Sequence, residues 1–208
     1  MELTRIAEAL KAGRVEDVKT YTEMALSVGK EPKEIINSGL MAGMNVVGEK
    51  FKNGEMFVPE VLIASKAMNA GMEIIKPLLK EGDVTSKGKA VFATVKGDLH
   101  DIGKKLVCMM MESSGYEVVD LGVDASPEKI IEAVKEHDAD IVGMSAMLTT
   151  TMMAMKNTVE GLKENGLYDD VKVMIGGAPV TDNYAEEIGA NYSSDSTEAV
   201  ELANRLMA

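Results

Sequence analysis

The chain has 208 residues, of which 46% are hydrophobic, and its 22 basic and 34 acidic side chains give a formal net charge of −12. This length predicts one large or two small domains, and the acidic excess, most of it after residue 86, argues against nucleic acid or an anionic membrane as a partner. The absence of a long apolar run or a charged-then-apolar leader predicts a cytoplasmic protein, and a single cysteine, Cys108, excludes a disulfide framework and is expected to be a buried thiol.

Residues 1–80 show the apolar spacing of amphipathic helices and no strand pattern. Helices are expected to begin near Leu3, Val15, Pro32 and Pro59 and to end near Gly13, Gly29, Gly54 and residue 80. Their expected core includes Met24, Met41, Leu62 and Leu78. Four amphipathic helices with short connections predict a small antiparallel bundle.

Residues 81–88 are polar and contain glycine, which is typical of a linker, and the hydrophobic period changes after them. Short apolar runs at 90–95, 116–120, 141–145 and 171–175 alternate with helical stretches near 103–114, 127–137, 150–165, 181–188 and 196–207. This alternation predicts an α/β domain over 89–208, a Rossmann-like (flavodoxin-like) parallel sheet covered by helices. Ligands of such sheets bind beyond the carboxyl ends of the strands.

The first apolar run is followed by Gly97-Asp98-Leu99-His100-Asp101-Ile102-Gly103-Lys104, which contains one of the two histidines of the chain. In an extended segment the side chains of Asp98 and His100 point the same way, so the carboxylate can accept one imidazole N–H and leave the other nitrogen free as a ligand or base. The two glycines suit a chain that wraps closely round a large flat ligand. On spacing alone, a histidine paired with a carboxylate in a turn explains the same residues.

Asp-x-His-x-x-Gly resembles the cobalamin-binding signature of corrinoid proteins in which a histidine is the lower cobalt ligand. The resemblance implies that His100 binds cobalt and that Asp98 and Thr151 handle the accompanying proton, with the Thr151 hydroxyl bonded to Asp98. It also implies cofactor contacts from Gly97, Asp101, Ile102 and Gly103.

Two further motifs follow later runs, Gly143-Met144-Ser145-Ala146-Met147-Leu148-Thr149-Thr150-Thr151 and Ile175-Gly176-Gly177-Ala178-Pro179-Val180. They resemble the Ser-x-Leu and paired-glycine signatures of the same proteins, with Met147 in place of the leucine, a change that conserves volume. The resemblance implies contacts to the corrin ring or its nucleotide tail from Ser145, Met147, Thr149, Gly176 and Gly177. Taken singly, these residues would be helix caps and a turn.

The segments 41–51 and 54–62 resemble the helical cap that covers the upper face of methylcobalamin. Candidates for an apolar lid over the cobalt are Met56, Phe57, Met68 and Met72, although ordinary bundle core explains them equally well. The resemblance therefore covers essentially the whole chain and divides it into a helical cap domain (1–80), a linker or hinge (81–88) and a cobalamin-binding domain (89–208). It is closest to the corrinoid proteins of methanogen and acetogen methyltransferase systems of the methylamine or quaternary-amine type, and it extends to the cobalamin module of methionine synthase.

This resemblance implies a methyl carrier that has no substrate turnover alone. A substrate-specific methyltransferase would move a methyl group from a methylated amine or betaine to Co(I). A second methyltransferase would pass it from methyl-Co(III) to a thiol or tetrahydrofolate, and a reductive activating protein would restore the cobalt.

Two alternatives remain open. The first is the cobalamin-binding subunit of a B12-dependent mutase, or a B12-sensing regulator. The second is a flavodoxin-like or receiver domain without a corrinoid, although a receiver would need an aspartate where this chain has Ser145.

Overall fold

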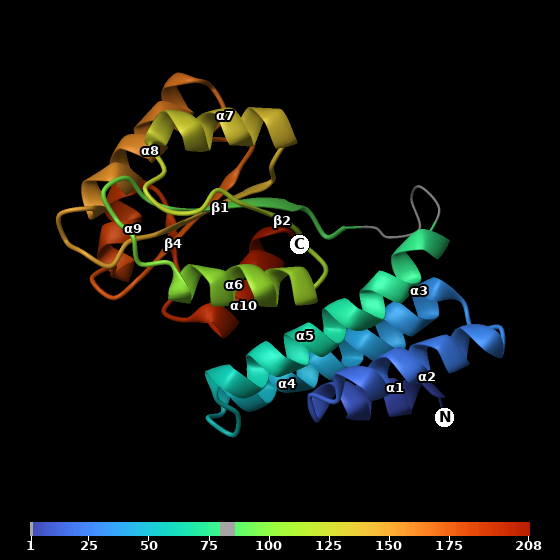
Figure 1. Cartoon of the computed structure of the whole chain (residues 1–208). Helices are drawn as coiled ribbons and strands as arrows, with labels where there is room; N and C mark the ends of the chain where they lie inside the picture. Colours follow the sequence, from blue (N-terminus) through green and yellow to red (C-terminus); the bar gives the residue numbers. More distant parts are fainter. Residues whose placement is uncertain (1, 80–85) are drawn as a thin grey trace. The chain divides into compact units, whose positions relative to one another are not determined.

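The computed structural model describes residues 2–79 and 86–208 (Figure 1). The chain divides into two compact units, and along the sequence the division falls between Thr85 and Ser86. Within the predicted linker 81–88, residues 81–85 lie outside the described residues. No helix among the described residues combines the length and the hydrophobicity that a membrane span requires.

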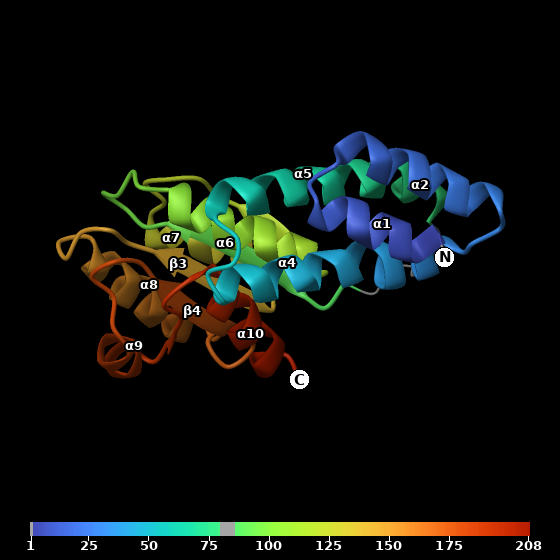
Figure 2. The same ribbon diagram turned by 90° about the horizontal axis from the view of Figure 1, so that it is seen from below.

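The helical unit is a bundle. Within residues 2–79, α1 (Glu2–Lys11) and α2 (Val15–Ser27) are followed by a long third helix and then by α5 (Val58–Ile75) and the short 3-10 turn η2 (Lys76–Leu78). The third helix consists of α3 (Pro32–Ile35), a π-helical segment η1 (Ile36–Met41) and α4 (Ala42–Lys52). The helices lie side by side in both views (Figures 1 and 2). The predicted helical bundle is confirmed.

Small residues allow the helices of the bundle to approach closely. A Cβ atom added at Gly71 in α5 would lie 2.7 Å from Leu40 Cδ2, and one at Gly39 would lie 3.3 Å from Ile6 Cγ2. Leu40 and Ile6 are fully buried. Close packing of these apolar side chains therefore depends on glycine at the facing positions.

Three residues expected in the core of the bundle are exposed, namely Met24 (42%), Leu62 (41%) and Leu78 (52%), and Met41 is half-buried. In α2 the buried stripe runs through Val18, Thr22 and Ala25, and Met24 lies beside it. Leu62 likewise lies beside the buried face of α5 and not on it. Leu78 belongs to η2, which follows the end of α5. The predictions for these three residues were wrong. Each apolar residue was expected to be buried, but only the residues on one face of each helix are buried.

The α/β unit contains a parallel sheet with strand order β2-β1-β3-β4-β5 in the described residues 86–208. Its strands are β1 (Lys89–Thr94), β2 (Glu117–Asp120), β3 (Ile141–Ser145), β4 (Lys172–Gly176) and β5 (Asn191–Tyr192). Its helices are α6 (Ile102–Ser113), α7 (Pro127–His137), α8 (Met152–Glu164), α9 (Asp182–Ile188) and α10 (Ser196–Leu206). Helices α6 and α10 cover one face, and α7 and α8 cover the other (Figures 1 and 2). The predicted α/β class is confirmed, and β5 is the strand that the apolar pattern missed.

The register of the sheet brings small polar residues together at one edge. Thr94 pairs with Ser145, and Ser145 pairs with Gly176, so the last residues of β1, β3 and β4 form a row. Because the strand order changes direction between β1 and β3, this edge is the topological switch point where ligands bind in such sheets. The fold therefore places the motif 97–104 at a position suited to a ligand.

Candidate functional site

The loop between β1 and α6 holds a buried carboxylate beneath an exposed imidazole. The Asp98 side chain is fully buried, whereas the His100 side chain is 54% exposed. His100 Nδ1 lies 2.7 Å from Asp98 Oδ1, which also accepts the backbone N–H of His100 at 3.0 Å. The expected Asp98–His100 contact is therefore present.

The second oxygen of Asp98 binds the loop between β3 and α8. Asp98 Oδ2 accepts hydrogen bonds from the backbone N–H groups of Met147 (2.7 Å) and Leu148 (3.3 Å) and from the Thr151 hydroxyl (2.8 Å). Burial alone raises the pKa of Asp98, but the hydrogen bonds from Met147, His100 and Thr151 outweigh it and hold the pKa well below its usual value. Asp98 is therefore a carboxylate at neutral pH.

An ionised Asp98 fixes the tautomer of the imidazole. A carboxylate only accepts hydrogen bonds, so Nδ1 of His100 carries the proton that Asp98 accepts. The lone pair of a neutral imidazole then lies on Nε2, on a side chain that is half exposed. His100 can thus serve as a metal ligand, oriented by a carboxylate and a threonine hydroxyl.

Thr94, at the end of β1, links the loop to the sheet. Its side chain is buried, its hydroxyl donates to the His100 carbonyl oxygen at 3.3 Å, and it lies 3.0 Å from Ser145 Oγ. Thr94 was not among the predicted site residues, although a polar residue that closes an otherwise apolar strand is a recognisable signal in the sequence.

Large apolar side chains surround His100 on the surface. Leu99 is 70% exposed and Ile102 is 81% exposed, while Met147 and Leu148 on the facing loop are exposed as well. Exposed apolar side chains gathered round a polar group mark a ligand-binding surface. This rim suits a flat, largely apolar ligand.

Glycine is needed for different reasons at different positions of the motifs. Gly177 has φ +123, and a Cβ there would lie 1.9 Å from the Ala146 carbonyl oxygen, while a Cβ at Gly176 would lie 2.9 Å from the Ser193 oxygen. The fold itself therefore requires Gly177 and restricts Gly176. A Cβ at Gly103, however, would meet no atom of the described residues within 4 Å apart from its own helical turn, so open space lies beside it.

The structure brings most of the predicted site residues together at the carboxyl edge of the sheet, from β1–α6, β3–α8 and β4–α9. The β1–α6 group is Gly97, Asp98, His100, Asp101, Ile102 and Gly103, and the others are Ser145, Met147, Thr149, Thr151, Gly176 and Gly177. Asp101 pairs with Lys105 at 2.6 Å, and Thr149 is exposed.

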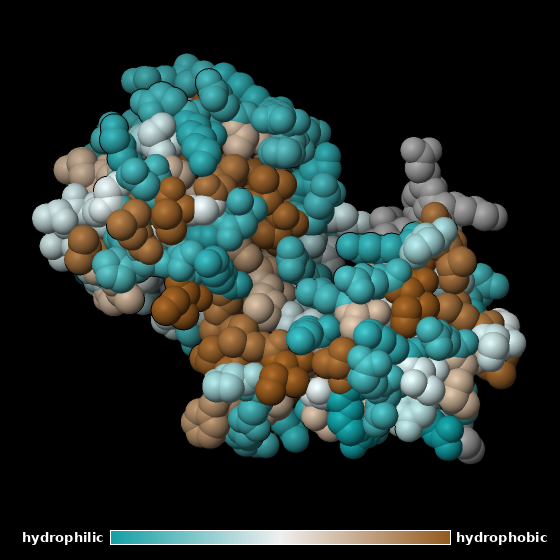
Figure 3. All heavy atoms as spheres, viewed as in Figure 1, coloured by the Kyte–Doolittle hydropathy of each residue, from teal (hydrophilic) through white to brown (hydrophobic). Residues whose placement is uncertain are grey.

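The four lid candidates belong to the helical unit. There Met56 and Met68 are buried, Met72 is half-buried, and Phe57 is 68% exposed. Of the four, Phe57 alone is freely accessible, and it precedes a hydrophobic surface along α5 (Figure 3) that includes Val58, Leu62 and Ile63.

Two buried hydroxyl groups at the start of α10 were not anticipated. Ser196 Oγ and Thr197 Oγ1 have no hydrogen-bond partner within the described part of the chain. They follow Ser193, whose backbone oxygen adjoins Gly176. Both oxygens are enclosed by protein atoms, and a buried hydroxyl without a partner is costly. No spacing in the sequence distinguishes them from ordinary capping residues.

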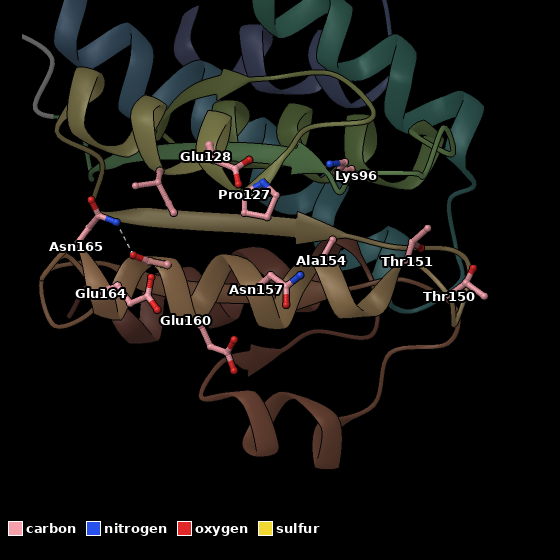
Figure 4. Close-up of a pocket in the computed structure, with 12 residues that line it drawn as sticks. Lys96, Pro127, Glu128, Thr150, Thr151, Ala154, Asn157, Glu160, Glu164 and Asn165 are labelled. Carbon is pink, nitrogen blue, oxygen red and sulfur yellow. Dashed lines mark hydrogen bonds between the residues drawn. The ribbon is translucent and has the colours of Figure 1, made fainter.

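A separate groove of about 440 Å³ lies between α7 and α8 (Figure 4). Its lining includes Lys96 and three carboxylates, Glu128, Glu160 and Glu164. Thr151 is the one predicted site residue that lines it. The groove therefore adjoins the site without containing the imidazole.

Comparisons with known proteins agree with this site. Two family profiles, both described as B12 binding domain, match residues 2–76 and 88–202. The dimethylamine corrinoid protein of Methanosarcina barkeri is 46% identical over 208 residues, covering 99% of this chain and 97% of the relative. A corrinoid protein of Desulfitobacterium hafniense is 40% identical over 209 residues, covering 99% and 97% of the two chains.

Solved structures show the same fold. The methanol:cobalamin methyltransferase complex MtaBC from Methanosarcina barkeri matches with a TM-score of 0.91 at 31% identity, over 99% of this chain and 79% of that chain. A cobalamin-binding protein from Desulfitobacterium hafniense DCB-2 matches with a TM-score of 0.80 at 36% identity, over 98% of both chains. The fold and the site thus define a B12-binding protein. The chain belongs to the family of corrinoid proteins that combine these two B12 binding domains.

Proposed function

We propose that this chain carries a methyl group on the cobalt of a bound corrinoid between two methyltransferases. The observation that carries the proposal is the His100 imidazole, whose Nδ1 is held by buried Asp98 and whose Nε2 is left for a metal. The corrinoid, when bound, supplies the cobalt that takes up and releases the methyl group. The chain supplies one nitrogen ligand and the groups that orient it.

The residues at the sheet edge fit a corrinoid. Leu99, Ile102 and Met147 would contact the apolar surface of the macrocycle, and the open space at Gly103 would admit its edge. The row of small residues at the ends of β1, β3 and β4 would receive the nucleotide tail.

The proton on His100 is controlled by the residues behind it. A neutral imidazole that used Nε2 as a metal ligand would keep its Nδ1 proton on the hydrogen bond to Asp98. If Nε2 were instead free to take up a proton, the adjacent carboxylate would stabilise the resulting cation. The hydrogen bonds from Met147, His100 and Thr151 together lower the pKa of Asp98 and keep it ionised at neutral pH.

We propose that the helical domain (1–80) acts as a cap for the upper face of the cofactor, with Phe57 and the apolar surface of α5 as the contact. Met56, Met68 and Met72 would then support this surface rather than all touching the cobalt, since two of the three are buried in the bundle. Segment 81–88 would be the hinge, most of it outside the described residues.

The methyl donor that we propose is a methylated amine, because the similar proteins include dimethylamine and trimethylamine corrinoid proteins of Methanosarcina. A substrate-specific methyltransferase would deliver the methyl group, a second one would transfer it to a thiol or tetrahydrofolate, and a reductive activating protein would restore Co(I). We place this cycle in the cytoplasm, where the single buried thiol would remain reduced.

The carrier role predicts that methylation requires a partner. The Co(I) protein is mixed with dimethylamine, trimethylamine, methanol or betaine, each with and without the matching methyltransferase, while the Co(I) absorption band is followed. The band should persist with every donor alone and should disappear within minutes when the correct methyltransferase is added. Rapid loss of the band with any of these donors alone would contradict the carrier role.

Two glycine substitutions separate the fold from the cofactor. Gly103→Ala should fold with unchanged or higher stability, by up to about 1 kcal/mol, because alanine is the better residue inside a helix. The added methyl group should nevertheless weaken corrinoid binding, because it enters the space proposed for the macrocycle. Gly177→Ala should destabilise the apoprotein, because its Cβ would overlap the Ala146 carbonyl oxygen.

The measurement is thermal melting of both apoproteins together with titration by methylcobalamin. Wild-type affinity in Gly103→Ala would show that the space at Gly103 is not used by the cofactor.

A further inference from the structure

The loop that carries His100 is held at both ends by one other loop. We call residues 97–104, which run from the end of β1 into the first turn of α6, the histidine loop, and residues 120–125, which run from the last residue of β2 toward α7, the neighbouring loop. Asp120 of the neighbouring loop pairs with Lys104, and Asp124 accepts the backbone N–H of Gly97 at 2.7 Å. Two carboxylates from one loop thus bind the first and last residues of the other.

The contact at Lys104 is a buried ion pair. The Lys104 side chain is 1% exposed and the Asp120 side chain is 31% exposed, and their charged atoms are in direct contact. Asp120 Oδ1 also accepts the backbone N–H of Gly122 at 2.9 Å. A buried ammonium group is stable only with a partner, so this pair fixes the first turn of α6 against the end of β2.

The contact at Gly97 uses an unusual backbone conformation. The backbone of Asp124 has φ +51. This lies in the left-handed region, which residues other than glycine, asparagine and aspartate rarely adopt. In this conformation the Asp124 carboxylate accepts from Gly97 while its backbone N–H donates to the Asp98 carbonyl oxygen at 3.0 Å. The left-handed conformation thus lets Asp124 bind the histidine loop through both its carboxylate and its backbone N–H.

The neighbouring loop is itself fixed to the sheet. The Leu121 N–H donates to the Phe92 oxygen at 2.8 Å, and the Thr94 N–H donates to the Gly122 oxygen at 3.0 Å. The Ala125 N–H in turn donates to the Thr94 oxygen at 3.0 Å. The loop therefore extends the strand pairing and offers a rigid support. The Asp120 carboxylate contacts Lys104 and Gly122, and the Asp124 carboxylate contacts Gly97, so both act on the backbone and the ends of the histidine loop rather than on the imidazole.

We propose that Asp120 and Asp124 are positioning residues for the cobalt ligand: by holding both ends of the histidine loop, they orient the His100 imidazole for coordination. This inference rests on the proposed role of His100. We call the Lys104–Asp120 and Gly97–Asp124 contacts the clamp. If either contact were lost, the loop would be free to rotate, and a fraction of the bound corrinoid would have water in place of the imidazole.

The test compares substitutions at Asp124 in full-length protein loaded with methylcobalamin. Asp124→Gly keeps the left-handed backbone and removes the acceptor, whereas Asp124→Asn keeps both an acceptor oxygen and the backbone preference. Asp138→Gly is the matched control, because Asp138 has the same φ of 51 at the end of α7. The visible spectrum at one fixed pH gives the ratio of histidine-bound to water-bound cobalt, and melting of the apoprotein reports stability.

Asp124→Gly should lower this ratio at least threefold, Asp124→Asn should restore most of it, and Asp138→Gly should match wild type. A second variant, the pair Lys104→Met with Asp120→Asn, removes the ion pair without leaving one charge buried alone, and its ratio should also fall at least twofold. A wild-type ratio in Asp124→Gly would overturn the clamp.

A His100→Ala sample in the same series distinguishes the two proposals. If His100→Ala changes the spectrum and Asp124→Gly does not, the clamp is wrong and the cobalt ligand stands. If His100→Ala has the wild-type spectrum, the ligand assignment fails and the clamp fails with it.

Discussion

Replacing His100 with alanine should yield a folded protein whose bound methylcobalamin has the spectrum of a water-ligated form. The only imidazole at the sheet edge would be gone, so no side chain there could replace it. Losing a group that orients a metal ligand typically lowers metal affinity by about 10- to 100-fold. We expect the loss of the ligand itself to lower the affinity for methylcobalamin by about the same factor or more. Absorption spectroscopy and equilibrium binding of methylcobalamin measure the two effects.

The fold should tolerate this change because the His100 side chain is half exposed, and Asp98 keeps its bonds to Met147, Leu148 and Thr151. His137→Ala is the control, since His137 is the only other histidine and lies at the end of α7. An identical spectrum in the wild type and the His100→Ala variant would remove His100 from the cobalt.

Asp98→Asn should be the most destabilising single substitution in the site that leaves the side-chain volume unchanged. Both carboxylate oxygens accept hydrogen bonds, and an amide would direct an NH2 group at the donors of one of them. Hydrogen bonds to a buried charged group contribute about 1.5–3 kcal/mol, so we expect a loss of this order in the free energy of unfolding at neutral pH. Urea denaturation of the apoproteins measures it.

The difference between wild type and Asp98→Asn should depend on pH in one direction. Hydrogen bonding holds the pKa of folded Asp98 well below the unfolded value of 3.8, so its contribution to stability is complete above that pH and is lost as the pH falls through the range below it. The two proteins should therefore converge in acid.

Asp101→Asn is the matched control for this pH dependence. It removes a carboxylate that pairs with the exposed Lys105, and solvent-exposed ion pairs of this kind contribute little to stability. A stability difference between wild type and Asp98→Asn that stays constant from neutral to acid pH would contradict the role of the Asp98 charge.

The sequence was most informative about features that depend on the spacing of residues close together in the chain. The alternation of apolar runs and helical stretches predicted the sheet and its helices, and the two-residue spacing of Asp98 and His100 predicted their contact, which the structure shows at 2.7 Å. The bond between Thr151 and Asp98 could not come from spacing, because 53 residues separate them, and it was inferred from the family resemblance.

What the sequence could not predict depends on tertiary contacts. β5 is two residues long and begins with Asn191, so it has no apolar run to recognise. Asp124 resembles any loop aspartate until the register of β2 against β1 places it beside Gly97. The lid candidates looked alike as an apolar stripe, yet only Phe57 is freely accessible in the helical unit, because burial depends on how the bundle closes.

The buried position of Cys108 affects whether its sulfur could be methylated. A methyl group on cobalt is an electrophile, and a nearby thiolate would be a competing acceptor that ends the cycle by alkylating the carrier. Cys108 is the only thiol of the chain and lies in α6, the helix that begins beside the site. Because burial raises the pKa of Cys108 to about 12 and leaves it 7% exposed, its sulfur stays protonated and sheltered at neutral pH. A methylated corrinoid bound beside α6 would therefore meet no accessible thiolate from this helix.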